Sequence, residues 1–191
     1  MESVDRPGRT VFIDPGHRNN EHDFGAVGPT GLRESEVALF VSHCLRTSLE
    51  PDYRVVMSRY GEDAKVSLSA RTKAANEEPA DIFVSIHTNA HSDPSAHGVE
   101  ILHWPTSAQG VDLASAILPP LVKATGDRNR GLKPRTDLAV LRQTRMPAVL
   151  VELPFISHPT WEETMRDCQF QLDCARAIAD GIRAYFKEMR T

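Results

Sequence analysis

Short apolar runs alternate along the chain with segments whose apolar residues recur at helical spacing. The short runs are rich in β-branched and aromatic residues, as is typical of buried strands. They cover 10–13, 53–57, 82–86, 98–103 and 148–151. The segments with helical spacing predict helices. The first predicted helix starts near Glu34, and the others cover 68–76, 113–122 and 168–186.

Strands that alternate with helices predict an α/β fold with a mostly parallel central sheet. The chain has 191 residues, which is within the usual range of one domain, and no internal repeat divides it. We therefore expect a single domain over residues 1–191. Ligands of such sheets bind beyond the carboxyl ends of the strands, so we expect one site there.

Three side chains with metal-binding or acid–base chemistry directly follow predicted strands. His17 comes after the turn that ends the first strand, His87 follows 82–86, and Glu152 follows 148–151. If these strands are parallel, the three side chains meet at one edge of the sheet. Glu34 begins the first helix after an irregular segment rich in Asn, Gly and Pro, and it could join them.

Two imidazoles and one carboxylate form a familiar set of ligands for hydrolytic zinc. Such a site keeps one position open for water and lowers the pKa of that water to about 7. A second carboxylate that does not bind the metal can then take the proton. The spacing alone gives a moderate signal, because the ligands are not in a compact H-E-x-x-H motif.

Five sequence segments strengthen this hypothesis. They are IDPGH (13–17), GLRESEVAL (31–39), SLSARTKAAN (67–76), VSIHTNA (84–90) and MPAVLVELPFISHP (146–159). In this order they resemble the motifs of zinc-dependent N-acetylmuramoyl-L-alanine amidases of the amidase-3 type. That group includes bacterial cell-separation enzymes and phage endolysins. The resemblance extends from about Val11 to Phe186, so it covers nearly the whole chain.

The resemblance implies a role for each of four residues. His17, Glu34 and His87 would bind one zinc ion per chain, and Glu152 would be the catalytic acid and base. It also implies a mixed six-stranded sheet flanked by helices. The implied activity is hydrolysis of the peptidoglycan amide bond between N-acetylmuramic acid and the L-alanine of the stem peptide.

The chain departs from the family pattern beside these residues. Arg18-Asn19 stands where glycines are usual, Leu153-Pro154 replaces a small residue and a glycine, and His158 replaces an asparagine. These changes bear on the shape of the groove and on substrate preference, while the four residues above are unchanged.

Other interpretations of the same residues are open. A histidine at the end of a strand is often structural, and a glutamate in the first turn of a helix is favoured by the helix dipole without any metal. Glu36 is an alternative to Glu34. Arg71 and Asn89 lie in matching segments and could contact the substrate, hold the loop or belong to the core.

Composition and charge exclude several partners. The net charge is −4 and the basic residues are scattered, so we expect no nucleic acid partner. The three cysteines form no C-x-x-C pair, which disfavours a disulfide framework and a thiolate zinc site. No segment reaches the roughly 18 consecutive apolar residues of a membrane span, and the first 12 residues lack the apolar core of a signal peptide.

We therefore expect a monomer that acts on peptidoglycan in the cell wall, without membrane insertion. It would be an endolysin released at lysis or a trimmed secreted enzyme. A zinc carboxypeptidase or other peptidoglycan peptidase is the enzymatic alternative, with Arg71 or Arg142 holding a peptide terminus. A non-catalytic wall-binding module is the other alternative, but it would not need Glu152.

Overall fold

The computed structural model describes residues 8–18, 23–61 and 66–189, which form one sheet covered by helices. The strands are β1 (Thr10–Pro15), β2 (Arg54–Met57), β3 (Ile82–Thr88), β4 (Val99–His103), β5 (Asn129–Pro134) and β6 (Ala148–Leu153). The helices are α1 (Glu34–Leu49), α2 (Leu68–Glu77), α3 (Ala108–Thr125), α4 (Ala139–Arg142), α5 (Pro159–Met165) and α6 (Cys168–Glu188).

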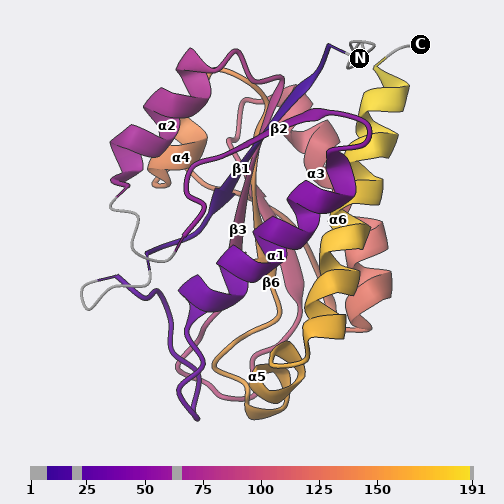
Figure 1. Ribbon diagram of the computed structural model, residues 1–191. Helices are drawn as coiled ribbons and strands as arrows, with labels where there is room; N and C mark the ends of the chain where they lie inside the picture. The colour runs from indigo at the N-terminus through magenta and orange to yellow at the C-terminus, as the bar shows by residue number, and fades with distance from the viewer. Residues whose placement is uncertain (1–7, 19–22, 62–65, 190–191) are drawn as a thin grey trace, which may run out of the picture.

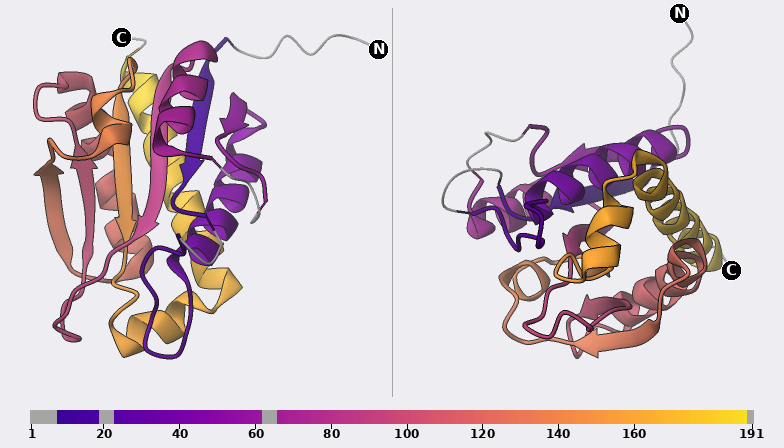
Figure 2. Two further views of the ribbon diagram at one scale, coloured as in Figure 1. Left: turned by 90° about the vertical axis from the view of Figure 1, so that its left-hand side faces the viewer. Right: turned by 90° about the horizontal axis from the view of Figure 1, so that it is seen from below.

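The sheet has six strands in the order β2-β1-β3-β6-β4-β5. Strands β2, β1, β3 and β6 are parallel to one another, whereas β4 is antiparallel to β6 and pairs in parallel with β5. The left view of Figure 2 shows β5 at the far edge from β1 and β2. The α/β fold and the mixed, mostly parallel six-stranded sheet are therefore confirmed.

Helices cover both faces of the sheet. Helices α1, α3 and α6 lie on one face, and α2 and α4 lie on the other (Figure 1). The short helix α5 and the segment before α1 lie near the end of the sheet where β1, β3 and β6 finish, at the bottom of Figure 1. This end is seen in the right view of Figure 2.

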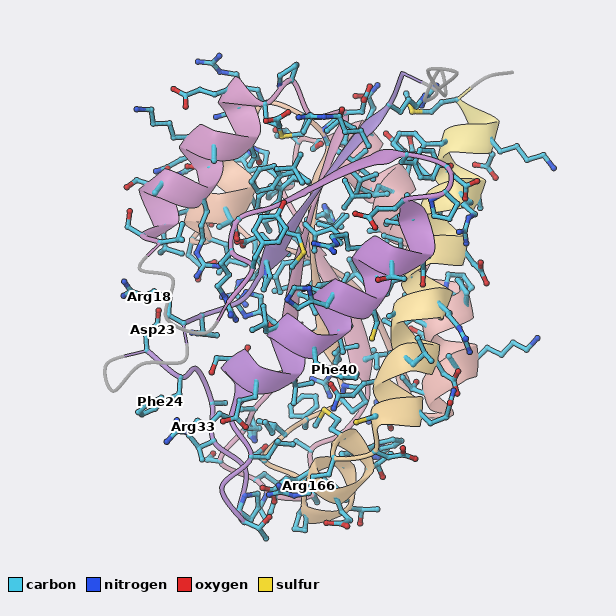
Figure 3. The ribbon with its side chains drawn as sticks, in the orientation of Figure 1. Arg18, Asp23, Phe24, Arg33, Phe40 and Arg166 are labelled. Carbon is cyan, nitrogen blue, oxygen red and sulfur yellow. The ribbon has the colours of Figure 1, made fainter. Side chains whose placement is uncertain are left out.

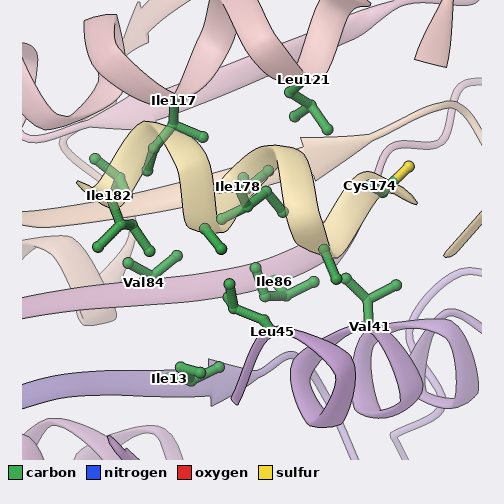
Figure 4. Close-up of a cluster of buried hydrophobic side chains, with 14 of the residues drawn as sticks. Ile13, Val41, Leu45, Val84, Ile86, Ile117, Leu121, Cys174, Ile178 and Ile182 are labelled. Carbon is green, nitrogen blue, oxygen red and sulfur yellow. The ribbon is translucent and has the colours of Figure 1, made fainter. Parts of the chain in front are cut away.

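The larger apolar core lies between the sheet and helices α1, α3 and α6. Ile13 of β1 and Ile86 of β3 pack there with Leu45 of α1, Ile117 of α3 and Ile178 of α6 (Figure 4). All five side chains are fully buried. At roughly 1.5–3 kcal/mol for each fully buried large apolar side chain, this layer is a main source of stability.

The segments predicted as strands and long helices form those elements, although several bounds differ. Helix α3 begins five residues before the predicted segment, with Ser107 as its N-cap. It ends at Thr125 and is capped by Gly126, which has a positive φ of 66°. Strand β5 and helices α4 and α5 were not predicted.

No helix among the described residues is both long and apolar enough to cross a bilayer. Residues 1–7 of the opening segment lie outside the described residues, so the prediction about a signal peptide stays a prediction.

Candidate metal centre

The side chains under α2 and α4 change from apolar to polar along each strand toward the carboxyl end. In β3, Phe83 is followed on the same face by Ser85 and then by His87, because alternate residues share a face. In β6, Leu150 is followed by Glu152. His87 and Glu152 are register partners on adjacent parallel strands, so their side chains lie side by side.

The structure brings His17, Glu34 and His87 together at this end of the sheet. His17 Nε2 lies 3.2 Å from Glu34 Oε2, and His87 Nδ1 lies 2.8 Å from Glu34 Oε1. Each residue offers one potential metal-ligand atom, and these three atoms all lie within 4.8 Å of one another. Two nitrogens and one carboxylate at these separations fit a divalent ion of the zinc type.

Glu34 is fixed in this position by the backbone around it. Its Oε2 accepts a hydrogen bond from the backbone N–H of Ala26 at 2.8 Å, and its Oε1 accepts one from Thr88 at 3.2 Å. The residue is only 4% exposed. Glu36 instead lines a separate groove together with Phe40, away from His17 and His87. The structure therefore places Glu34, and not Glu36, beside the two histidines.

Glu152 lines the same cavity as the three candidate ligands. Its Oε2 is buried and has no hydrogen-bond partner among the described residues. Burial raises the pKa of Glu152 to about 7, and the charges of Glu34 and Glu100 add to this, while His87 and His17 oppose it. A cation at the neighbouring triad would lower this pKa, because positive charge favours the carboxylate.

Hydrogen bonds join the three side chains of the triad and shift the pKa values of His17 and Glu34. Burial lowers the pKa of His17, but hydrogen bonds to Glu34 and Asp23 outweigh that effect and raise it to about 9. Burial raises the pKa of Glu34, but the bonds to His17 and His87 lower it well below its usual range. A metal ion that binds here must displace the proton of His17, since only the neutral imidazole is a ligand.

Two buried arginines hold the turn that carries His17. This residue has a φ of 56°, a left-handed conformation that is uncommon outside glycine. Arg71 donates from Nη2 to the carbonyl of His17 at 2.6 Å, and Arg59 donates from Nη2 to that of Gly16 at 2.9 Å. The same Arg59 nitrogen reaches the carbonyl of Ser35 at 2.9 Å, which links the turn to the start of α1.

Two glycines allow the candidate ligands to approach one another. A Cβ atom on Gly16 would lie 2.5 Å from the ring of His87. A Cβ atom on Gly25 would lie 2.4 Å from Glu34 Oε2, and this residue also has a positive φ of 73°. Glycine at both positions is therefore a steric condition for the arrangement of His17, Glu34 and His87.

The segment before α1 is anchored by α5. The carboxylate of Glu162 is 1% exposed and accepts backbone hydrogen bonds from Thr30 at 2.9 Å and Leu32 at 3.0 Å. In the same segment, the guanidinium of Arg33 lies 4.4 Å from the ring centre of Phe24 (Figure 3). These contacts fix the path of the chain into Glu34.

The cavity has a volume of about 950 Å³ and extends away from the triad between α2 and the segment that includes α4. Asn89 lines it and donates from Nδ2 to Glu100 Oε1 at 3.0 Å. Arg71 also lines it, but the residue is only 2% exposed and its guanidinium is bound to Asp14 and to the turn at His17. Of the alternatives for Arg71, these bonds favour holding the loop, and direct substrate contact by Asn89 or Arg71 stays a prediction.

Several residues that shape the site were not singled out from the sequence. Asp14 and Gly16 lie within the IDPGH segment, so that motif pointed to their position without showing their partners. Asp23 lies in an irregular segment, and Arg59 lies in a loop, where no periodic pattern marks them. Glu100 is the register partner of Glu152 on the antiparallel strand β4, a pairing that strand periodicity alone does not reveal.

This fold and site define a class of protein, an α/β domain with a candidate metal centre and a second acid at the carboxyl edge of its sheet. Residues 11–184 match the sequence family described as N-acetylmuramoyl-L-alanine amidase. The chain belongs to this amidase family.

Several known relatives of the chain are named as amidases. The N-acetylmuramoyl-L-alanine amidase LytC of Bacillus subtilis is 35% identical over 94% of this chain and 36% of its own length. The sporulation-specific N-acetylmuramoyl-L-alanine amidase of the same species is 35% identical over 95% of this chain and 69% of its own length. The chain thus spans about a third of LytC.

A crystal structure of N-acetylmuramoyl-L-alanine amidase from Clostridium difficile 630 has the same fold. It superposes with a TM-score of 0.88 at 32% identity, over 94% of this chain and 97% of the other. The likeness therefore extends over nearly the whole of both chains.

Proposed function

We propose that this domain uses one zinc ion to hydrolyse the amide bond between N-acetylmuramic acid and the L-alanine of the peptidoglycan stem peptide. The observation that carries the proposal is the meeting of His17, Glu34 and His87 within 4.8 Å of one another, with Glu152 in the same cavity. Membership of the amidase family supports the choice of bond.

The three clustered side chains fit the ion. His17 and His87 would each supply one nitrogen and Glu34 one oxygen, a set that suits zinc and leaves room for a further ligand. Bound zinc would supply a Lewis acid for the scissile carbonyl and lower the pKa of a water to about 7.

Glu152 would act as the general base and then as the general acid. Its carboxylate, which lines the cavity, accepts a proton from the attacking water. The same carboxyl then gives this proton to the departing L-alanine nitrogen, because an unprotonated amide nitrogen is a very poor leaving group. The C–N bond breaks, and the products are a carboxylic acid on the lactyl group and a free amine on the stem peptide.

The setting of this reaction follows from its substrate. Peptidoglycan is the partner, so the domain acts on the cell wall, and relatives such as LytH of Staphylococcus aureus are named as probable cell wall amidases. Neither nucleic acid nor an inserted membrane segment has a part in the proposal. A monomer is sufficient, because all four functional side chains come from one chain.

The proposal is tested by digesting purified peptidoglycan with the zinc-loaded protein and identifying the new ends. We expect stem peptides that begin with a free L-alanine amine. Glu152→Ala should keep its zinc and lose activity by roughly 10²- to 10⁴-fold, the range for a lost general acid–base group. Glu163→Ala, at an 82% exposed side chain of α5, is the control that should retain activity.

The alternatives give different results in the same assay. A carboxypeptidase or other peptidase would leave the glycan–alanine bond intact and release amino acids or shortened peptides. A wall-binding module would bind the sacculus without new ends. Near-normal activity of Glu152→Ala, or one retained zinc per chain in His17→Ala, would contradict the assigned roles.

A further inference from the structure

We propose that Asp23 is a positioning residue for the metal centre, whose carboxylate holds the His17 ring so that Nε2 faces the ion. This inference rests on the proposed zinc site and adds a residue outside the ligand set. Asp23 lies at the edge of the cavity, in the segment between β1 and α1.

The contact itself is short and well directed. His17 Nδ1 lies 2.7 Å from Asp23 Oδ1, while the other ring nitrogen, Nε2, faces Glu34. A hydrogen bond from Nδ1–H to the carboxylate therefore selects the tautomer whose Nε2 lone pair points toward the triad. This geometry assigns Nδ1 of His17 to Asp23 and leaves Nε2 for the ion.

A second contact involves the other oxygen of the carboxylate. Arg18 donates from Nε to Asp23 Oδ2 at 3.0 Å, and the backbone N–H of Arg18 donates to the carbonyl of Asp23 at 2.9 Å. Figure 3 shows the side chains of Arg18 and Asp23 next to each other. The two oxygens of Asp23 therefore have different partners, one on the candidate ligand and one on the arginine.

The expected effect follows from how carboxylates act on histidine ligands. A carboxylate that accepts the second N–H of the imidazole fixes the ring orientation and increases the basicity of the nitrogen that binds the metal. Loss of such a partner typically lowers metal affinity by roughly 10- to 100-fold.

The chain contains a similar contact that serves as a comparison. His97 Nδ1 lies 2.7 Å from Asp127 Oδ1, but that carboxylate also accepts from the backbone N–H groups of Gly98 and Arg128. Among the described residues, His97 belongs to no cluster of three potential ligands. A carboxylate–imidazole contact alone therefore does not indicate the role proposed for Asp23. The role depends on the second contact of the same imidazole, from His17 Nε2 to Glu34.

The test is zinc affinity, measured by competition with a chelator of known zinc affinity, on the full chain. Asp23→Ala should lower the affinity by roughly 10- to 100-fold, and Asp23→Asn by less, since the amide oxygen still accepts the hydrogen bond. Asp137→Asn is the matched control. It removes a carboxylate that lines the same cavity and pairs with Arg135, but that forms no hydrogen bond or ion pair with a candidate ligand among the described residues. Its zinc affinity should stay within about threefold.

Arg18→Ala distinguishes positioning of His17 from simple stabilisation of the loop. If Asp23 acts through His17, Arg18→Ala should change zinc affinity by less than about threefold, because the contact to Nδ1 remains. Equal losses in Arg18→Ala and Asp23→Ala would overturn the proposal, as would unchanged affinity in Asp23→Ala. Zinc binding by the parent protein distinguishes failure of this inference from failure of the proposed function. If the parent protein does not bind stoichiometric zinc, the metal centre itself is refuted.

Discussion

The two faces of the sheet use the same alternation of side chains for different purposes. Under α1, α3 and α6 the inward residues are apolar along most of each strand, as in Ile82, Val84 and Ile86 of β3. Under α2 and α4 the same strand continues from Phe83 to Ser85 and His87. The face under α1, α3 and α6 therefore packs apolar side chains along most of its length, whereas the face under α2 and α4 has polar side chains near the cavity.

This difference teaches why the site is built on strands and not on loops alone. His87 and Glu152 are positioned by adjacent strands whose opposite face is fully packed, so their separation is set by the sheet. Rigid elements hold functional groups more accurately than loops do. The face under α2 and α4, here called the polar face, lowers stability near the cavity. The face under α1, α3 and α6, here called the apolar face, offsets this loss.

The largest expected effect on stability comes from breaking the buried ion pair on the polar face. Asp14 is 1% exposed and accepts hydrogen bonds from Arg71 at 2.7 Å and from Ser85 at 2.8 Å. Arg71→Met should lower the free energy of unfolding by roughly 3–5 kcal/mol, because it leaves a buried carboxylate without its cation. Urea unfolding measures this loss. Adding Asp14→Asn should restore part of it, and a lack of any restoration would show that the charge is not the cause.

A cavity on the apolar face should affect stability but not the metal. Leu45 of α1 is fully buried, so Leu45→Ala should lower the free energy of unfolding by about 2–5 kcal/mol. Zinc affinity of the folded protein should stay within a few fold of the parent. Phe40→Ala on the same helix is the control, because Phe40 is 39% exposed and should cost less than about 1 kcal/mol. A large loss of zinc affinity in Leu45→Ala would show that the two faces are coupled.

A single methyl group on the polar face should affect the metal more than the fold. Gly16→Ala would place Cβ 2.5 Å from the His87 ring and push that ring away from Glu34. We expect zinc affinity to fall at least about tenfold, or about 1.4 kcal/mol. Gly61→Ala is the matched control, since a Cβ there meets nothing within 4 Å. Equal zinc affinities of the two variants by chelator competition would contradict this account of Gly16.

The smallest expected effect is a pH dependence of zinc affinity, which arises from His17 at the cavity end of the polar face. His17 has a pKa of about 9 and must lose its proton to bind zinc, so affinity should rise with pH below that value. The rise should be about tenfold per pH unit between about pH 7 and pH 8 if one proton is released. Calorimetry in buffers of different ionisation enthalpy counts the released protons. A flat affinity over this interval would contradict the raised pKa of His17.

Much of the fold could be predicted because strands and long helices have strong local patterns. The apolar runs before His17, His87 and Glu152 marked three strands that meet at one edge, and this juxtaposition is what the structure shows. Strand β5 was missed because its sequence, NRGLKP, is polar and partly exposed at the edge of the sheet. Helix α4 has only four residues, too few to show a helical period.

Interactions that join distant segments could not be predicted from local patterns. Arg59 acts on the turn at His17 through backbone carbonyls, and nothing in the sequence around it indicates that contact. Asp23 lies in an irregular segment, where position relative to His17 depends on the whole path of the loop. The candidate ligands could be proposed because motifs identified them, whereas the residues that position them required coordinates.

The central claim is that one zinc ion binds His17, Glu34 and His87 with Glu152 facing the open side of the site. Anomalous scattering at the zinc absorption edge, from crystals of the zinc-loaded protein, tests it most directly. The account predicts one strong peak in contact with all three side chains and within reach of a water or substrate atom beside Glu152. A stoichiometric peak elsewhere, or one that lacks any of the three side chains, would contradict it.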